Sequence, residues 1–143
     1  VVVGAGGLVA LVLSPLLGAL ADRYGVWRVL IIGSLVAVVL WPLPALVRGL
    51  VPFTVAFAAV NGVTSGVFAI SFTALSGAAP AEVRGRVMSF AYLPVNLGSM
   101  SGPLIGSLVT QISIFAVFPA AAVIMLAGVG MLFSARRQGQ DRA

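Results

Sequence analysis

The sequence predicts an all-α integral membrane protein, a bundle of five transmembrane helices, and three observations lead to this prediction. Hydrophobic residues make up 61% of the 143 residues, charged residues make up 8%, and the mean hydropathy is +1.19. A soluble domain needs many more charged residues than this to cover its surface. The charges also separate apolar stretches of about 20 residues, the helix length that crosses a hydrocarbon core of about 30 Å.

Charged and turn-forming residues divide the chain into five predicted spans. The spans cover residues 1–21, 29–47, 52–77, 87–109 and 112–134, and a short basic tail follows at 136–143. Pro52 suits the first turn of its helix, where a missing N–H costs no hydrogen bond. The other prolines of the spans predict kinks, which membrane bundles tolerate because neighbouring groups satisfy the freed carbonyls. They are Pro15, Pro42, Pro44, Pro94, Pro103 and Pro119.

The arginines predict the orientation of the bundle. All but Arg48 are expected on one membrane face, namely Arg23, Arg28, Arg84, Arg86, Arg136, Arg137 and Arg142. Because basic residues gather on the cytoplasmic side, we expect a multi-pass protein of the cell membrane with a cytoplasmic C-terminus. The first span begins without a Met or a basic leading region, so we expect the chain to be the C-terminal remainder of a longer protein.

The residue types that are absent exclude several kinds of chemistry. The sequence contains no Cys, His or Lys. Ser-His and Cys-His nucleophile pairs, Cys- or His-ligated metal sites and Schiff-base lysines are therefore excluded. The arginines lie between apolar stretches and do not form the basic face of a nucleic-acid site. We expect no catalytic residues, no metal site and no nucleic-acid partner.

The loop after the first predicted span carries a motif that orientation alone does not explain. It reads Gly18-Ala-Leu-Ala-Asp22-Arg23-Tyr-Gly25-Val-Trp-Arg28. Gly18 allows close helix packing and Gly25 permits a tight turn, but the acidic Asp22 contributes little to orientation. The motif resembles the G-x-x-x-D-R-x-G signature of the major facilitator superfamily, although two uncharged residues stand where the family often has a basic pair. The resemblance implies that Asp22 and Arg23 belong to a cytoplasmic gate.

A second loop, between the third and fourth spans, reads Pro80-Ala-Glu82-Val-Arg84-Gly-Arg86. Proline and a carboxylate both suit the start of a helix. The segment resembles the P-x-E-x-R-G-R loop that precedes a helix in the same superfamily. Both loops are predicted on one membrane face, so Arg84 or Arg86 could pair with Asp22; the alternative is that they are independent surface arginines.

The fourth span carries a third motif, Gly98-Ser-Met-Ser-Gly102-Pro103-Leu-Ile-Gly106. Glycines every four residues form a flat stripe for helix packing, and Pro103 bends the helix axis. The pattern resembles the glycine-proline motif in the fifth helix of antiporters of this superfamily, and such patterns also occur in the eleventh helix. Three motifs in family order predict a partial major facilitator fold. We favour helices eight to twelve over two to six, because the last span ends in a short basic tail.

Polar side chains are concentrated in the third and fourth spans, whereas the second and fifth carry few and are expected to face lipid. By helical spacing, two faces are predicted to contact substrate: Asn61, Thr64, Ser65, Phe68 and Phe72 on the third span, and Tyr92, Asn96 and Ser99 on the fourth. In the family these would be the cavity-lining tenth and eleventh helices. The alternative is that these small polar residues hold helices together.

The sequence thus predicts secondary active transport of a small solute by alternating access, with efflux among the expected directions. The expected partners are the solute, the lipid bilayer and the missing half of the transporter, and the resemblance implies no cofactor. The alternative function is a non-transporting membrane scaffold or assembly subunit, which would use the glycine stripes but would not need Asp22. A channel is not favoured, because the sequence shows no ring of charges.

Overall fold

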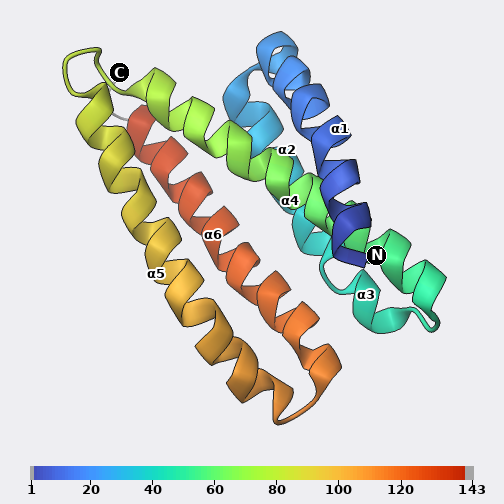
Figure 1. The fold of residues 1–143 in the computed structure, drawn as a ribbon. Helices are drawn as coiled ribbons and strands as arrows, with labels where there is room; N and C mark the ends of the chain where they lie inside the picture. Colours follow the sequence, from blue (N-terminus) through green and yellow to red (C-terminus); the bar gives the residue numbers. More distant parts are fainter. Residues whose placement is uncertain (1, 141–143) are drawn as a thin grey trace.

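The computed structural model describes residues 2–140, which are helical throughout apart from short connections (Figure 1). The helices are α1 Val2–Tyr24, α2 Val26–Leu40, α3 Leu43–Leu46, α4 Leu50–Ala78, α5 Arg84–Thr110, the 3-10 helix η1 Ile114–Ala116, and α6 Val117–Gln140. Side chains are described from residue 3 to residue 134. Five long helices correspond to the five predicted spans, so the predicted fold class is confirmed.

Four of the described helical segments are long and apolar enough to cross a membrane. They are Val3–Tyr24, Val26–Leu46, Leu50–Ala78 and Ile114–Ser134. Helix α5 has the length of a span, at 27 residues, but it contains two arginines and many Ser and Gly residues, and none of its residues is buried within the chain. A polar helix of this length needs protein or water beside it, because polar side chains within membrane helices face the bundle interior or a cavity.

The second predicted span is broken and not continuous. Helix α2 ends at Leu40, and the four-residue helix α3 follows Pro42. Prolines at 42 and 44 lack the N–H that would continue the hydrogen-bond ladder, so the kink predicted here is a complete break. The kink predicted at Pro119 is wrong, because this residue lies in the first turn of α6, where proline is tolerated.

Glycines with positive φ make two of the connections. Gly25 is the single residue between α1 and α2 and has φ 92°, and Gly49 has φ 99° immediately before α4. Side chains with a Cβ rarely adopt this conformation. The turn predicted at Gly25 is therefore confirmed.

The loops sort to two opposite ends of the bundle. Figure 1 places the α1–α2 turn, the α4–α5 loop and the end of α6 at one end. The N-terminus, the segment around α3 and the α5–α6 connection lie at the other. This arrangement brings the loops of Arg23, Arg28, Arg84 and Arg86 to one end and that of Arg48 to the other, as the charge pattern predicts. Helix α6 continues through Gln140 into the predicted tail, whose residues 141–143 lie outside the described part.

The core lies between α1, α2 and α4 and extends to α6. Its buried members are Ala21, Val29, Leu30, Val67 and Ile70, and Met125 and Leu132 of α6 pack against them. Helix α2 was expected to face lipid, but one of its faces, which includes Ser34, is buried in this core. Ile32 and Val39 are exposed on its outer face, and contact of this face with lipid stays a prediction.

Candidate substrate pocket and gating loops

A polar pocket of about 250 Å³ lies beside α4. Its lining residues are Trp41, Asn61, Thr64, Ser65 and Phe68. Four of them were predicted from their spacing on one face of α4, because a helix repeats about every 3.6 residues. Trp41 was not predicted. The Trp-Pro dipeptide that ends α2 could have indicated it, because the break there ends the helix at this ring.

The hydroxyl of Thr64 distinguishes this pocket from ordinary helix packing. Its Oγ1 is buried and has no hydrogen-bond partner among the described residues. Asn61, in contrast, donates from Nδ2 to the carbonyl oxygen of Phe57 at 2.9 Å. A buried hydroxyl without a partner lowers stability by about 1–3 kcal/mol. Because Oγ1 has almost no exposed surface, a ligand or a water molecule in the pocket would remove that cost only after the side chain turns about χ1.

A row of aromatic rings connects the pocket to α5. The ring centroids of Phe68 and Phe72 are 5.0 Å apart, and those of Phe72 and Tyr92 are 5.3 Å apart. Such tilted pairs are favourable beyond the apolar area that they bury. Phe68 and Tyr92 remain 49% and 54% exposed, so their rings are available to a further partner.

The structure does not bring all the predicted contact residues together. Asn96 and Ser99 are exposed on α5 and do not line the pocket. Ser99 donates its hydroxyl hydrogen bond to the carbonyl oxygen of Val95 in its own helix, at 2.9 Å. Their role in substrate contact stays a prediction.

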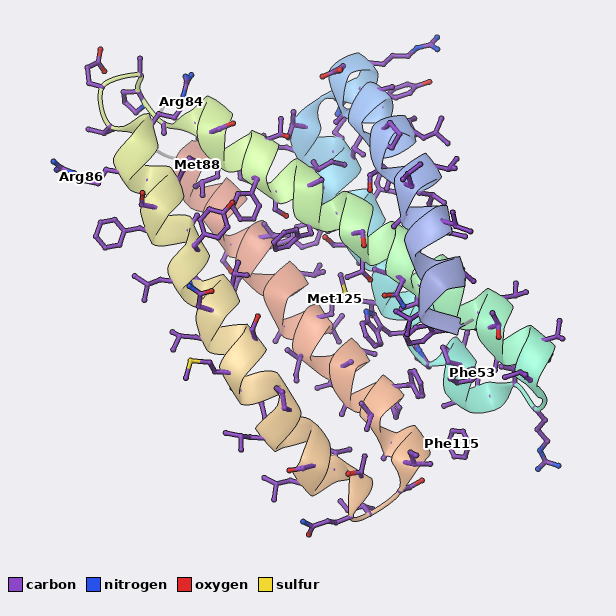
Figure 2. The ribbon with its side chains drawn as sticks, viewed as in Figure 1. Phe53, Arg84, Arg86, Met88, Phe115 and Met125 are labelled. Carbon is purple, nitrogen blue, oxygen red and sulfur yellow. The ribbon has the colours of Figure 1, made fainter. Side chains whose placement is uncertain are left out.

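The predicted gate residues gather at one end of the bundle. Asp22 and Arg23 are exposed at the end of α1, and the Arg23 guanidinium lies 5.5 Å from the centre of the Tyr24 ring. Figure 2 shows Arg84 and Arg86 at the start of α5, with Arg86 pointing away from the other helices.

Of the two alternatives for Arg84 and Arg86, a pair with Asp22 or independent surface arginines, the pair is not formed in this structure. Within the described side chains, neither Arg84 nor Arg86 lies within 4.0 Å of the Asp22 carboxylate. Arg84 instead donates from Nη2 to the carbonyl oxygen of Ala79 at 3.4 Å. Glu82 precedes α5, which begins after Val83, so this carboxylate does not lie in the first helical turn as expected.

The glycines of the motifs are not close to other helices within the described part of the chain. A Cβ added at Gly18, Gly98, Gly102 or Gly106 would meet no atom within 4 Å. Gly102 and Gly106 line a shallow apolar pocket of about 170 Å³ between α5 and α6. The packing role of these glycines stays a prediction.

Close helix packing occurs instead at two glycines of α4, which were not among the predicted packing residues. A Cβ at Gly62 would lie 2.6 Å from Cγ1 of Val9, and one at Gly66 would overlap Cδ1 of Leu17. Gly62 and Gly66 form a G-x-x-x-G pattern, the sequence signal that could have identified them. At these two glycines, α1 packs directly against α4.

The fold and the site define a multi-pass helical membrane protein with a polar, aromatic-walled pocket beside one long helix. The profile of the Major Facilitator Superfamily matches residues 1–143, and the chain belongs to this family.

Curated relatives agree with this assignment. The chain is 32% identical over 111 residues to the multi-drug resistance efflux pump PmrA homolog of Lactococcus lactis. This alignment covers 74% of this chain and 26% of that protein. The chain is 30% identical over 139 residues to the uncharacterized MFS-type transporter YuxJ of Bacillus subtilis. This alignment covers 96% of this chain and 35% of that protein. It is 34% identical over 93 residues to the multidrug resistance protein B homolog of Mycobacterium tuberculosis, over 64% of this chain and 17% of that protein. The chain therefore spans about a third or less of the length of these relatives. No solved structure matches the chain significantly.

Proposed function

We propose that the chain is one part of a secondary active transporter of the cell membrane that exports a small solute by alternating access. The observation that carries the proposal is the pocket beside α4, where the buried Thr64 hydroxyl lacks a protein partner. The relative that is named as a multi-drug resistance efflux pump supports export, and a second relative is named as a multidrug resistance protein. The proposal assigns the chain no catalytic step and no cofactor, and its partners are the solute, the bilayer and the rest of the transporter.

The chemistry of the pocket suits an amphipathic solute. Its polar groups are the neutral Asn61, Thr64 and Ser65, and its apolar walls are the rings of Trp41 and Phe68. A few directional polar groups set among aromatic walls are typical of small-molecule sites. The adjoining rings of Phe72 and Tyr92 extend the apolar wall toward α5.

The charged residues of the two loops are proposed as the gate of this transporter. They are Asp22, Arg23, Arg28, Glu82, Arg84 and Arg86. Their loops lie at the same end of the bundle, yet no ion pair joins Asp22 to Arg84 or Arg86 within the described side chains. A charge pair that forms in one transport state and opens in the other would bias the two states against each other. Alternating access requires such a two-state element at each end of the pathway.

The test of the pocket compares two hydroxyls on α4 in the complete transporter. Thr64→Val keeps the shape of the side chain but removes the hydroxyl, and ethidium efflux from cells is the assay. We expect the apparent affinity for ethidium to fall about 2- to 12-fold, the equivalent of a hydrogen bond of about 0.5–1.5 kcal/mol. Ser71→Ala is the matched control, because the Ser71 hydroxyl already donates to the carbonyl oxygen of Val67 at 2.8 Å.

Two results would contradict the proposal. If Thr64→Val, Ser71→Ala and wild-type protein have equal apparent affinities for ethidium at matched expression, the pocket is not part of the transport pathway. Absence of ethidium efflux and of any other solute export from the wild-type protein would favour the scaffold function instead.

A further inference from the structure

The start of α1 lies against an amide that lines the polar pocket. Gly6 of α1 is buried, and a Cβ built on it would lie 3.3 Å from Cβ of Asn61, 3.5 Å from its Cγ and 3.7 Å from its Nδ2. The neighbouring glycines do not share this contact, because a Cβ at Gly4 or Gly7 would meet no atom within 4 Å. Figure 1 shows the start of α1 crossing α4. Of these three glycines, it is therefore Gly6 that contacts the Asn61 side chain.

The Asn61 amide is held at its nitrogen and free at its oxygen. Nδ2 donates to the carbonyl oxygen of Phe57 at 2.9 Å, which orients the amide plane. Oδ1 accepts no hydrogen bond from the described residues, and unlike Oγ1 of Thr64 it is not fully buried. An amide oxygen has two lone pairs that accept hydrogen bonds. Because Asn61 lines the pocket, this oxygen is available to a group inside it.

The free amide oxygen differs in its chemistry from the other polar groups of the pocket. The hydroxyls of Thr64 and Ser65 can turn to donate or to accept a hydrogen bond, whereas Oδ1 of Asn61 can only accept. A solute with an N–H or O–H group satisfies this oxygen, and a solute without one leaves it unpaired. A site built to hydrogen-bond its substrate discriminates against the analogue that lacks the matching group for this reason.

We propose that Oδ1 of Asn61 selects solutes that carry an N–H or O–H donor, and that Gly6 is the positioning residue that holds the amide for this contact. The inference rests on the proposed function, because it takes the pocket as the site of the transported solute. A methyl group at position 6 would lie 3.3 Å from Cβ of Asn61, closer than such atoms normally approach. Rotation about χ1 does not move this Cβ, so relief comes from a shift of α4 against α1 or from a turn of the amide. Either movement displaces Oδ1 within the pocket, and hydrogen bonds weaken steeply as their angle worsens.

The experiment compares ethidium, whose aromatic amino groups carry N–H donors, with the same phenanthridinium dye without those amino groups. Titration calorimetry of the complete purified transporter gives the affinity for each dye, and the ratio of the two affinities is the readout, because a general loss of structure weakens both. We expect the wild-type protein to prefer ethidium about 2- to 12-fold, the equivalent of one hydrogen bond. Asn61→Leu keeps the branched shape but removes the amide, so it should abolish the preference. Gly6→Ala should lower the preference by about half or more.

Two glycine variants are the controls, and both should keep the wild-type preference. Gly7→Ala adds a methyl group where no atom lies within 4 Å, and Gly66→Ala presses on Leu17 at another point of the contact between α1 and α4. An unchanged preference in Asn61→Leu or in Gly6→Ala would overturn the inference. A Gly6→Ala protein that does not fold, or that loses no more of the preference than Gly66→Ala, would also overturn it, because Gly6 would then serve packing alone.

The same measurements separate this inference from the proposed function. If the wild-type protein binds the two dyes equally and Thr64→Val still weakens ethidium efflux, the inference fails and the solute pocket stands. If the wild-type protein binds neither dye, the assignment of the pocket as the solute site fails, and the inference fails with it.

Discussion

The packing of α1 against α4 yields a prediction whose magnitude follows from the structure. A Cβ at Gly62 would lie 2.6 Å from Cγ1 of Val9 and 3.5 Å from the backbone carbonyl carbon of the same residue. Valine is stiff about χ1, so rotation of its side chain offers little relief. The helices would have to move apart, and we expect Gly62→Ala to lower the free energy of unfolding by about 1–3 kcal/mol, the usual cost of overpacking.

Gly66→Ala should cost less, although the overlap is larger in the static structure. The added Cβ would meet Cδ1 of Leu17, the end of a side chain with two rotatable bonds, while Cγ and Cβ of Leu17 lie at 3.4 and 3.5 Å. A change of the leucine rotamer relieves most of this contact without moving a helix. We expect a loss of about 1 kcal/mol, at the low end of the overpacking range.

The assay is the unfolding of the complete transporter in mixed micelles, followed by circular dichroism. Gly77→Ala is the matched control on α4, because a Cβ there would meet no atom within 4 Å, and we expect a change within about 0.5 kcal/mol. Val9→Ala removes the Cγ1 contact, so it should restore part of the stability of Gly62→Ala, with a coupling of about 0.5–3 kcal/mol. If Gly62→Ala unfolds at the same midpoint as Gly77→Ala, the close contact between α1 and α4 is refuted.

Two further predictions concern the loops. A Gln138→Cys variant of this cysteine-free chain should not be labelled by an impermeant thiol reagent added outside intact cells, because the arginine distribution predicts a cytoplasmic C-terminus. Rapid labelling from outside would show that the topology is the reverse of the predicted one. Asp22→Asn should reduce the rate of solute transport by the complete protein far more than it reduces solute binding, because the carboxylate is proposed to bias a conformational equilibrium and does not line the pocket. If Asp22→Asn transports solute at the wild-type rate at matched expression, Asp22 has no role in gating.

The sequence predicted the helices better than the contacts between them. Span length and charge placement depend on local composition, so five helices could be located, and the tight turn at Gly25 followed from a single residue type. The break after Leu40 was predicted only as a kink. Whether a proline bends a helix or ends it depends on the packing around it, and Pro44 is fully buried against neighbouring segments.

The pocket was predictable to the extent that it lies on one helix. Helical spacing alone placed Asn61, Thr64, Ser65 and Phe68 on a common face, and the structure shows them in one pocket. Trp41 enters that pocket from a segment 20 residues earlier in the sequence, through the chain break after α2. Spacing within a helix carries no information about such a contact.

The two glycine stripes of the chain differ in their surroundings. Side chains of α1 already occupy the space beside Gly62 and Gly66, so this packing is formed within the chain. Gly98, Gly102 and Gly106 of α5 form a stripe with the same four-residue spacing, but an added Cβ there would meet nothing within 4 Å. Helix α5 is also the least apolar of the long helices and has no buried residue, while its Tyr92 ring continues the aromatic wall of the pocket. Gly102 and Gly106 border an apolar pocket toward α6, so it is the absence of buried residues on α5, and not the glycine stripe, that marks this helix as the place where further segments of the proposed transporter would pack.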